Sequence, residues 1–228
     1  MITRKCAPRP FETTRRDGQL VVILLLAMAG TLPAKGQERV ASEGGSIAGS
    51  IDSTWIRRTP AVVFVKKVPG EHAPPEDHAV MDQRKMAFIP HLLPVLRGTQ
   101  VDFPNNDAVR HNVFSPSRSA RQFNVGLYPA GSSRTVTFEN VGVVPLLCNV
   151  HSEMLAFIAV LRNPYFATTD KEGRFRIDEV PSGKYELTFW HEKLAPQTAK
   201  IPVVSGKTTK VTFRNLKRTR QYRVKLVP

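Results

Sequence analysis

Residues 143–161 read VVPLLCNVHSEMLAFIAVL, two apolar runs on either side of a short polar segment. Both runs are rich in Val, Ile, Leu and Phe, which favour β-strands, and we expect strands over 143–148 and 155–161. The residues from Cys148 to Met154 then form a loop between two strands rather than a helix. This segment decides the fold, because it places a thiol, an imidazole and a thioether at one end of a β-sheet.

Short runs of Val, Ile, Phe and Thr recur along the rest of the chain, separated by Pro, Gly and Asn, and helical periodicity is nearly absent. Residues 71–83 carry two prolines and scattered charge, and we expect a surface loop with one helical turn there. This texture predicts an all-β sandwich. Further strands are expected at 46–51, 61–66, 86–89, 99–103, 111–114, 123–125 and 133–138.

The pattern of apolar and polar residues changes after residue 164. Residues 169–189 read TDKEGRFRIDEVPSGKYELTF, with apolar and polar residues alternating around glycine-containing turns. Such alternation is typical of antiparallel strands with one buried face, and we expect hairpins in this part of the chain. Residues 203–213 continue the pattern.

The N-terminus has the pattern of a secretory signal. Basic residues are frequent in 1–18, and the apolar run at 19–30 is shorter than the ~20 residues that a membrane-spanning helix needs. We expect cleavage after Gly36, with Ala34 as the alternative site and an uncleaved membrane anchor as the alternative fate. Cys6 precedes the apolar run, so no lipid-attachment box is present.

The chain of 228 residues is basic, with 33 Lys and Arg against 19 Asp and Glu and a formal charge of +14. Loss of residues 1–36 leaves an excess of +10, which favours anionic partners, whereas export argues against nucleic acid. Processing also leaves Cys148 as the only thiol, which excludes a disulfide framework. A lone thiol in an oxidising compartment is a liability unless it is protected or used, and this is the first pointer to function.

Cys148, His151 and Met154 offer one metal-ligating atom each within seven residues. Soft sulfur ligands with imidazole suit copper or zinc, and the lack of clustered carboxylates argues against calcium or magnesium. A fourth ligand has to come from elsewhere, and His111 is the candidate for it. Glu153 beside the loop methionine leaves open a direct carboxylate ligand, against a solvated side chain.

The ligand spacing C-x2-H-x2-M resembles that of the cupredoxins, the blue-copper electron carriers, and its short loop is similar to that of amicyanin. The resemblance extends over roughly residues 86–161 and includes 101–107, VDFPNND, which leads to His111. It implies a Greek-key β-sandwich over 37–162 that holds one copper ion per chain, cycling between Cu(I) and Cu(II).

The same resemblance assigns the residues of the site. It implies His111, Cys148 and His151 as equatorial ligands and Met154 as the weak axial ligand. It also implies that the side chain of Asn112 ties the two ligand segments together. We expect one edge of the His151 ring to reach solvent.

Residues 163–228 resemble the carboxypeptidase-regulatory-like, transthyretin-like β-sandwich module. The pattern D-x-x-G-x-F-x-I-x-x-V-P-x-G-x-Y-x-L that carries this resemblance runs over 170–187, and it brings no catalytic residues. Such a module usually has two strands before this point. Either residues 45–66 lend those strands, or the two sandwiches share an edge.

These features predict an exported, periplasmic type 1 copper protein that carries single electrons, similar to the proteins described as methylamine-utilisation or plastocyanin-like proteins. No enzyme is expected, because phosphate loops, nucleophile elbows and paired-carboxylate patterns are missing from the sequence. We expect a redox partner protein, an acidic one being favoured by Arg110, and an anionic surface as the alternative role of the basic tail at 217–225. The rival functions are copper storage or delivery without electron transfer, and an adhesion or carbohydrate-associated module with a vestigial metal site.

Overall fold

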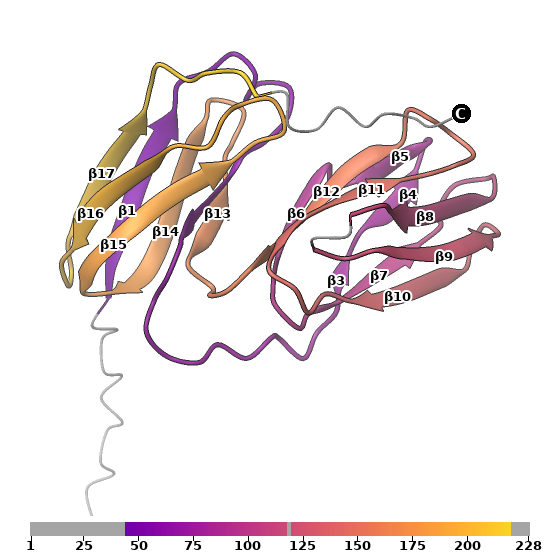
Figure 1. Cartoon of the computed structure of the whole chain (residues 1–228), viewed down its shortest axis with the longest axis horizontal. Coiled ribbons are helices and arrows are strands. Elements are labelled where there is room, and N and C mark those ends of the chain that lie inside the picture. The colour runs from indigo at the N-terminus through magenta and orange to yellow at the C-terminus, as the bar shows by residue number, and fades with distance from the viewer. Residues whose placement is uncertain (1–43, 118–119, 220–228) are drawn as a thin grey trace, which may run out of the picture. The chain divides into compact units, whose positions relative to one another are not determined.

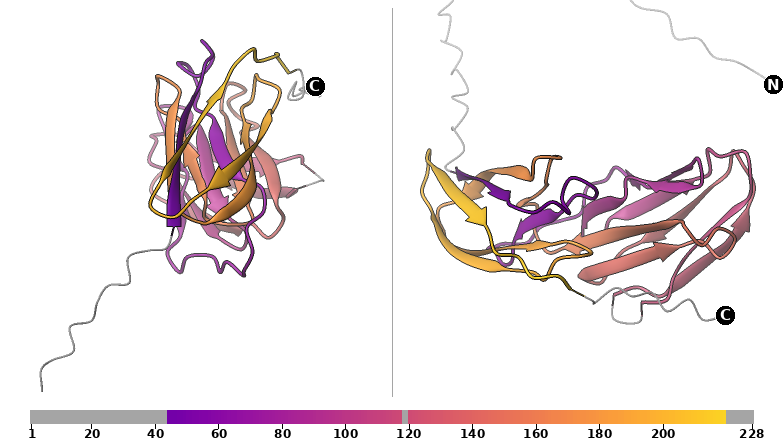
Figure 2. Two further views of the ribbon diagram at one scale, coloured as in Figure 1. Left: turned by 90° about the vertical axis from the view of Figure 1, so that its left-hand side faces the viewer. Right: turned by 90° about the horizontal axis from the view of Figure 1, so that it is seen from above.

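The computed structural model describes residues 44–117 and 120–219, and every regular element within these ranges is a β-strand (Figures 1 and 2). The predicted all-β class is confirmed. The predicted signal at 1–36, with Cys6 and both candidate cleavage sites, lies outside the described residues. In the described ranges no helix has the length and hydropathy to cross a membrane.

One sandwich consists of two sheets with the strand orders β14-β1-β17 and β13-β2-β15-β16. Its core contains buried Ile, Val, Leu and Phe side chains from both sheets. Its strands are β1 (Gly44–Ile51), β2 (Val62–Val65), β13 (Phe166–Thr168), β14 (Arg174–Pro181), β15 (Gly183–Trp190), β16 (Thr198–Val203) and β17 (Thr208–Phe213).

Strands from the beginning of the described chain complete this sandwich. β1 pairs antiparallel with β14 and parallel with β17, and β2 pairs antiparallel with β13 and β15. The first of the two alternatives is therefore the one observed, because residues 45–66 lend strands to the C-terminal module. The predicted domain boundary at 162 stays a prediction, and we propose from the pairing that a cupredoxin-like segment is inserted between β2 and β13.

The expectation that β14 and β15 form a hairpin is wrong, because these consecutive strands lie in different sheets. The turn between them carries the chain across the sandwich instead of back along its own sheet. The alternation of buried and exposed residues is the same in both cases, since it reports only that one face is buried. β15 and β16 do form an antiparallel pair between neighbours in sequence.

The D-x-x-G part of the pattern has a local physical cause. One carboxylate oxygen of Asp170 accepts the backbone N–H of Glu172 at 3.0 Å and of Arg174 at 2.7 Å, which closes the turn before β14. Gly173 has φ of 81°, and a Cβ atom there would lie 2.4 Å from the carbonyl oxygen of Ile51. Only glycine accommodates both the left-handed conformation and the approach of β1.

The inserted segment contains a five-stranded sheet of order β6-β12-β11-β8-β9, a three-stranded sheet of order β10-β7-β3 and the pair β4-β5 (Figure 1). Its bounds are β3 (Ala79–Val80), β4 (Asp82–Arg84), β5 (Ala87–Ile89), β6 (Leu92–Leu96), β7 (Gln100–Pro104), β8 (His111–Ser115), β9 (Phe123–Tyr128), β10 (Ser133–Thr137), β11 (Gly142–Leu147) and β12 (Leu155–Leu161).

Most expected strands of this segment are present within a few residues of their predicted bounds, but three are not predicted by the sequence. The predicted loop at 71–83 is confirmed for residues 71–78, but the helical turn is wrong, and β3 and the start of β4 occupy the rest of the range. β6 escapes detection because Pro94 interrupts its pattern. Its position explains why proline is tolerated, since β6 is an edge strand that pairs only with β12.

A buried ion pair involves Glu192, which is 7% exposed. Its carboxylate oxygens lie 3.1 Å from His91 Nε2 and 3.2 Å from Lys193 Nζ. Burial alone would raise the pKa of this carboxyl, but the hydrogen bond and charge of His91, aided by Lys193, lower it to about 2. The folded protein therefore holds Glu192 ionised, and His91 has a structural role as its partner.

We predict that Glu192→Gln destabilises the fold by roughly 3 kcal/mol at pH 7, because the pKa is lowered from 4.5 to about 2 and each unit corresponds to about 1.36 kcal/mol of preference for the ionised form. The loss should shrink as the pH falls from about 5 toward the folded pKa of about 2, since the wild type is itself protonated there. Urea unfolding at several pH values measures this. Glu139→Gln, at an exposed site, is the matched control, and an equal effect of both substitutions at every pH would contradict the prediction.

Candidate metal centre

His111, Cys148 and His151 form the one group of potential metal ligands found in the described part of the chain. Their ligand atoms all lie within 4.8 Å of one another. His111 and Cys148 are buried and His151 is partly exposed, as expected for the ring that reaches solvent. The thiol forms no disulfide. Three of the four expected ligands thus come together from two distant parts of the sequence.

Strand register brings these residues together. β8 and β11 are antiparallel neighbours, and Leu147 at the end of β11 lies opposite Phe114 near the end of β8. Continuing this register beyond β11 directs the chain from Cys148 toward the beginning of β8, where His111 lies. The loop that follows then folds back into β12, so His151 is held between two strand ends.

The two imidazoles face each other through their Nδ1 atoms, which lie 3.1 Å apart. The rings meet edge to face, with centroids 4.8 Å apart and an interplanar angle of 63°. Two nitrogens that ligate one ion at about 2.0 to 2.1 Å each lie roughly 3 to 4 Å apart. The observed spacing therefore suits two ligands of a common ion.

A carboxylate lies on the other side of the first imidazole. Asp107 Oδ2 is 3.0 Å from His111 Nε2 and 2.7 Å from the backbone nitrogen of Met86, whose N–H it accepts. The bond from Met86, followed by that from His111, lowers the pKa of Asp107 to about 2, so this side chain is an ionised acceptor. His111 therefore carries its proton on Nε2 and turns an Nδ1 lone pair toward His151 and Cys148.

Met154 is 1% exposed and lies in the same core cluster as Cys148. Its backbone N–H donates to the carbonyl of His151 at 3.1 Å, which closes a turn within the loop. Glu153 is exposed and accepts a hydrogen bond from Ser152 at 3.0 Å, so it is not a member of the ligand group.

Asn112 differs from its implied role. Its Nδ2 donates to Asn124 Oδ1 at 2.7 Å on the neighbouring strand β9, and its Oδ1 is buried without a hydrogen-bond partner. The side chain therefore supports β9 rather than the loop after β11. The expected tie between the two ligand segments is not formed by this side chain in the structure.

Asn105 has a supporting role that the sequence did not reveal. It is fully buried, and its Nδ2 donates to the carbonyl of Val109 at 2.9 Å, while its Oδ1 accepts the N–H of Asp107 at 3.1 Å. These bonds fix the turn that carries Asp107 and leads to His111. The sequence signal for this role is the polar run NND, which comes immediately after a strand.

The remaining four histidines lie outside the ligand group. His78 pairs with Asp102 at 3.1 Å, and His91 pairs with Glu192. His191 is buried and hydrogen-bonded to Thr59 at 2.9 Å, as expected of a packing residue. His72 packs edge to face on Tyr165. Only two of the six histidine side chains therefore belong to the ligand group.

The donor set fits copper better than a hard cation. It combines two imidazoles, whose Nδ1 atoms face each other, with a buried thiol, and no carboxylate joins the group. Thiolate and imidazole suit Cu(I), Cu(II) and zinc, whereas calcium and magnesium prefer oxygen ligands. A bound ion would displace the proton that one Nδ1 donates to the other, because both nitrogens must offer a lone pair to the metal.

Comparison with known families matches a segment in the C-terminal part of the described chain. Residues 156–215 match the carboxypeptidase regulatory-like domain. The match begins on β12, in the five-stranded sheet, and continues through the strands β13 to β17. The expected resemblance of this part of the chain is thereby confirmed. No curated protein matches the chain.

Among solved structures, similar chains are cupredoxins and a copper enzyme, in line with the resemblance expected for the first part. A purple cupredoxin from Nitrosopumilus maritimus is 24% identical, covers 36% of this chain and 98% of its own, and has a TM-score of 0.33. A mutant of amicyanin in its reduced Cu(I) form is 22% identical over 43% of this chain and 97% of its own, with a TM-score of 0.35.

A Cu-containing nitrite reductase from Thermus scotoductus is also similar, at 22% identity and a TM-score of 0.36. The match covers 42% of this chain but only 25% of that protein. Scores at this level carry no functional inference. The function proposed for the site therefore rests on the ligand geometry of this chain and not on these similarities.

We predict that purified protein binds copper at one equivalent per chain and that binding stabilises it. A ligand at 100 times its dissociation constant adds about 2.7 kcal/mol to the free energy of unfolding. Metal analysis after dialysis and urea unfolding with and without copper measure both effects. His111→Ala should abolish them, whereas His78→Ala, at an exposed ion pair, should retain them. Equal copper retention by the two variants would count against the site.

Proposed function

We propose that the chain is an exported type 1 copper protein that carries single electrons between redox partners through His111, Cys148, His151 and Met154. The observation that supports this most is the convergence within 4.8 Å of one imidazole from the start of β8 with a buried thiol and a second imidazole from the loop after β11. Two histidines and a cysteine with a long axial sulfur are the ligand set of blue-copper electron-transfer sites. Met154 is buried in the same core as Cys148 and would supply that sulfur.

A bound copper ion would supply the one-electron couple between Cu(II) and Cu(I). The protein's part is to keep the ligands in one arrangement in both oxidation states. Cys148 directly follows β11, and His111 begins β8, so both are fixed by strands with buried neighbours. The loop between Cys148 and Met154 is short and closed by a turn, which limits rearrangement.

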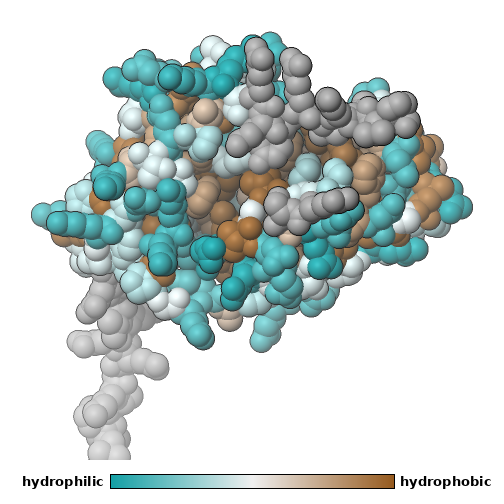
Figure 3. Space-filling model, viewed as in Figure 1, coloured by the Kyte–Doolittle hydropathy of each residue, from teal (hydrophilic) through white to brown (hydrophobic). Residues whose placement is uncertain are grey.

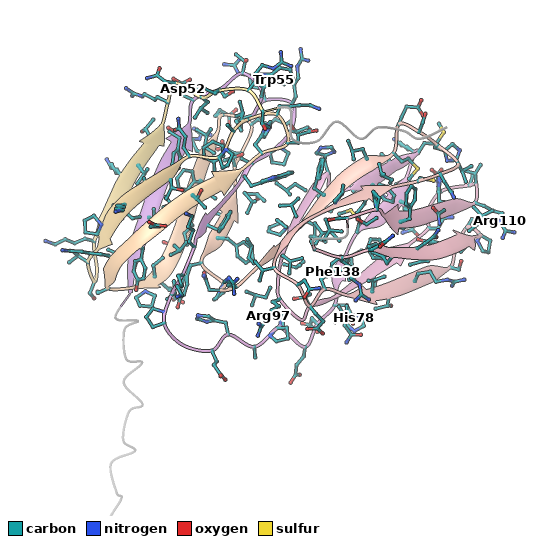
Figure 4. All side chains as sticks on the ribbon, in the orientation of Figure 1. Asp52, Trp55, His78, Arg97, Arg110 and Phe138 are labelled. Atoms are coloured by element: carbon teal, nitrogen blue, oxygen red, sulfur yellow. The ribbon has the colours of Figure 1, made fainter. Side chains whose placement is uncertain are left out.

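The exposed edge of His151 would be the electron entry and exit, because the other two members of the group are buried. Apolar side chains lie exposed on segments joined to the ligands, namely Val109 near His111 and Val150 beside His151, at 44% and 51%. Figure 3 shows hydrophobic surface beside hydrophilic surface at the edge of the view where Figure 4 labels Arg110. An apolar contact with a cationic rim suits a partner that is acidic around its own redox centre.

The same ligands could serve a copper-storage or delivery protein, which is the rival function. A carrier exchanges electrons quickly between its two oxidation states, whereas a storage protein has no need to do so. The partly exposed His151 ring favours the carrier. NMR line broadening in mixtures of the Cu(I) and Cu(II) forms measures the self-exchange rate, and slow exchange would favour storage.

The proposal is for a carrier rather than an enzyme, although the similar nitrite reductase is an enzyme by its name. A carrier needs only a rigid site and a docking surface, and the strand-held ligands and the exposed Val109 and Val150 support this proposal. Periplasmic location follows as part of the proposal from the predicted signal and from the lone buried thiol. The oligomeric state is not part of it.

The C-terminal module would stabilise or dock the carrier. A basic cluster lies on this sandwich, where Arg58 and Arg218 both stack on the Trp55 ring system, at 5.7 and 4.9 Å from the ring centroid. The cluster continues the predicted basic tail, of which residues 220–228 lie outside the described ranges. We propose contact of this cluster with an anionic surface as a secondary role.

Copper addition to the purified apoprotein should produce an intense visible thiolate-to-Cu(II) band, because a cysteine thiolate donates charge to Cu(II). Cys148→Ser should abolish the band while leaving the fold intact, since serine is nearly isosteric with the buried thiol. His191→Gln is a control at a buried histidine outside the site and should keep the band. A colourless wild type that takes up no copper would reject the proposed function.

Electron transfer to an acidic partner should slow as ionic strength rises, because salt screens the attraction of the cationic rim. Arg110→Glu should lower the association rate several-fold at low salt. Stopped-flow oxidation by a negatively charged small complex measures the effect. Lys200→Glu, on β16 of the other sandwich, changes the net charge equally and should have little effect, and identical slowing by both substitutions would exclude a local docking site.

A further inference from the structure

The loop before β8 holds a carboxylate against the first imidazole of the metal centre. Asp107 Oδ2 accepts both the Nε2–H of His111, at 3.0 Å, and the backbone N–H of Met86, at 2.7 Å. The other carboxylate oxygen accepts the N–H of Ala108 at 3.0 Å. His111 itself is 0% exposed. In the described structure its side chain hydrogen-bonds to this carboxylate and to the facing Nδ1 of His151.

Hydrogen bonds from two neighbouring segments fix the position of this carboxylate. Asn105, fully buried, accepts the N–H of Asp107 and donates to the carbonyl of Val109. The bond from Met86 ties the same carboxylate to the tight turn between β4 and β5, in which Lys85 and Met86 both have positive φ. Two neighbouring segments thus converge on one charged group behind His111.

We infer that Asp107 is a positioning residue that tunes the metal centre, fixing the tautomer and orientation of His111 and lowering the reduction potential of the bound copper. The inference rests on the proposed copper function and adds a residue that the ligand pattern does not contain. Its role is separate from ligation, because the carboxylate contacts the far nitrogen of the ring and not the group of ligand atoms.

The physical basis is charge. A histidine ligand that donates its second N–H to a carboxylate becomes a stronger electron donor to the metal, and its ring cannot rotate. The added negative charge favours Cu(II), the more positive ion, over Cu(I). Because His111 is buried, solvent screens this interaction less than it screens a surface pair. The consequence is a lower potential and tighter binding of Cu(II).

Asp107→Asn tests this, because the amide keeps an acceptor oxygen in reach of His111 and Met86 and removes the charge, at the cost of the bond from the Ala108 N–H. We expect Cu(II) affinity to fall about 10 to 100-fold, the usual effect of losing such a partner. Cu(I) affinity should fall less, so that the potential rises by about 59 mV or more, a tenfold shift of the one-electron equilibrium. Competition with a chelator and redox titration measure the two quantities.

Asp102→Asn is the matched control. Asp102 also pairs with a histidine, His78 at 3.1 Å, and its loss changes the net charge by the same amount. His78 is outside the ligand group, and Figure 4 labels it well apart from Arg110, the neighbour of His111 in sequence. Equal potentials for the two variants would overturn the inference, because the effect would then be one of overall charge.

A measurement on the wild type covers the case in which Asp107→Asn does not fold. Nitrogen NMR of the diamagnetic Cu(I) protein should detect a proton on His111 Nε2 that exchanges slowly with solvent, and none on Nδ1. A rapidly exchanging or absent Nε2 proton would overturn the inference. If the wild type takes up no copper, the proposed function fails, whereas a copper protein whose potential is unchanged by Asp107→Asn retains that function and loses only the role of Asp107.

Discussion

The antiparallel pairing of β8 with β11 is the constraint on which the metal centre depends. A single register, with Leu147 opposite Phe114, directs the end of one strand toward the beginning of the other. A slip of one residue would move every side chain of β11 to the opposite face of the sheet and would separate the thiol from the first imidazole. Apolar packing on the buried faces of β11 and β12 fixes that register, so the core determines where the ligands lie.

The ligand loop was predictable from sequence because its chemistry is local. Cys148 and His151 stand three residues apart after an apolar strand, and the predicted export signal makes a lone thiol conspicuous. His111 required a resemblance to a known family, since nothing in its own neighbourhood identifies its partner. Asp107 was missed because a carboxylate in a tight turn has many ordinary explanations, and only the folded loop directs it onto His111.

The errors in the fold have a common physical origin. Alternation along a strand reports which face is buried but not which strand lies beside it, so β14 and β15 were expected to pair although they belong to different sheets. The edge strand β6 was missed because Pro94 is allowed only where one side of the strand has no partner. A local sequence pattern cannot predict which strands pair when they are far apart in sequence. Such long-range pairings complete the C-terminal module.

The position of β1 bears on the order in which the molecule assembles. β1 lies between β14 and β17, so the earliest described strand has no hydrogen-bonding neighbour until the last ones are available. Contacts of such long sequence separation form late, because the chain entropy of closing the loop is lost before they are gained. This order suits the export proposed above. Because the sandwich closes only when synthesis is nearly complete, the polypeptide stays unfolded long enough to pass through a translocation pore.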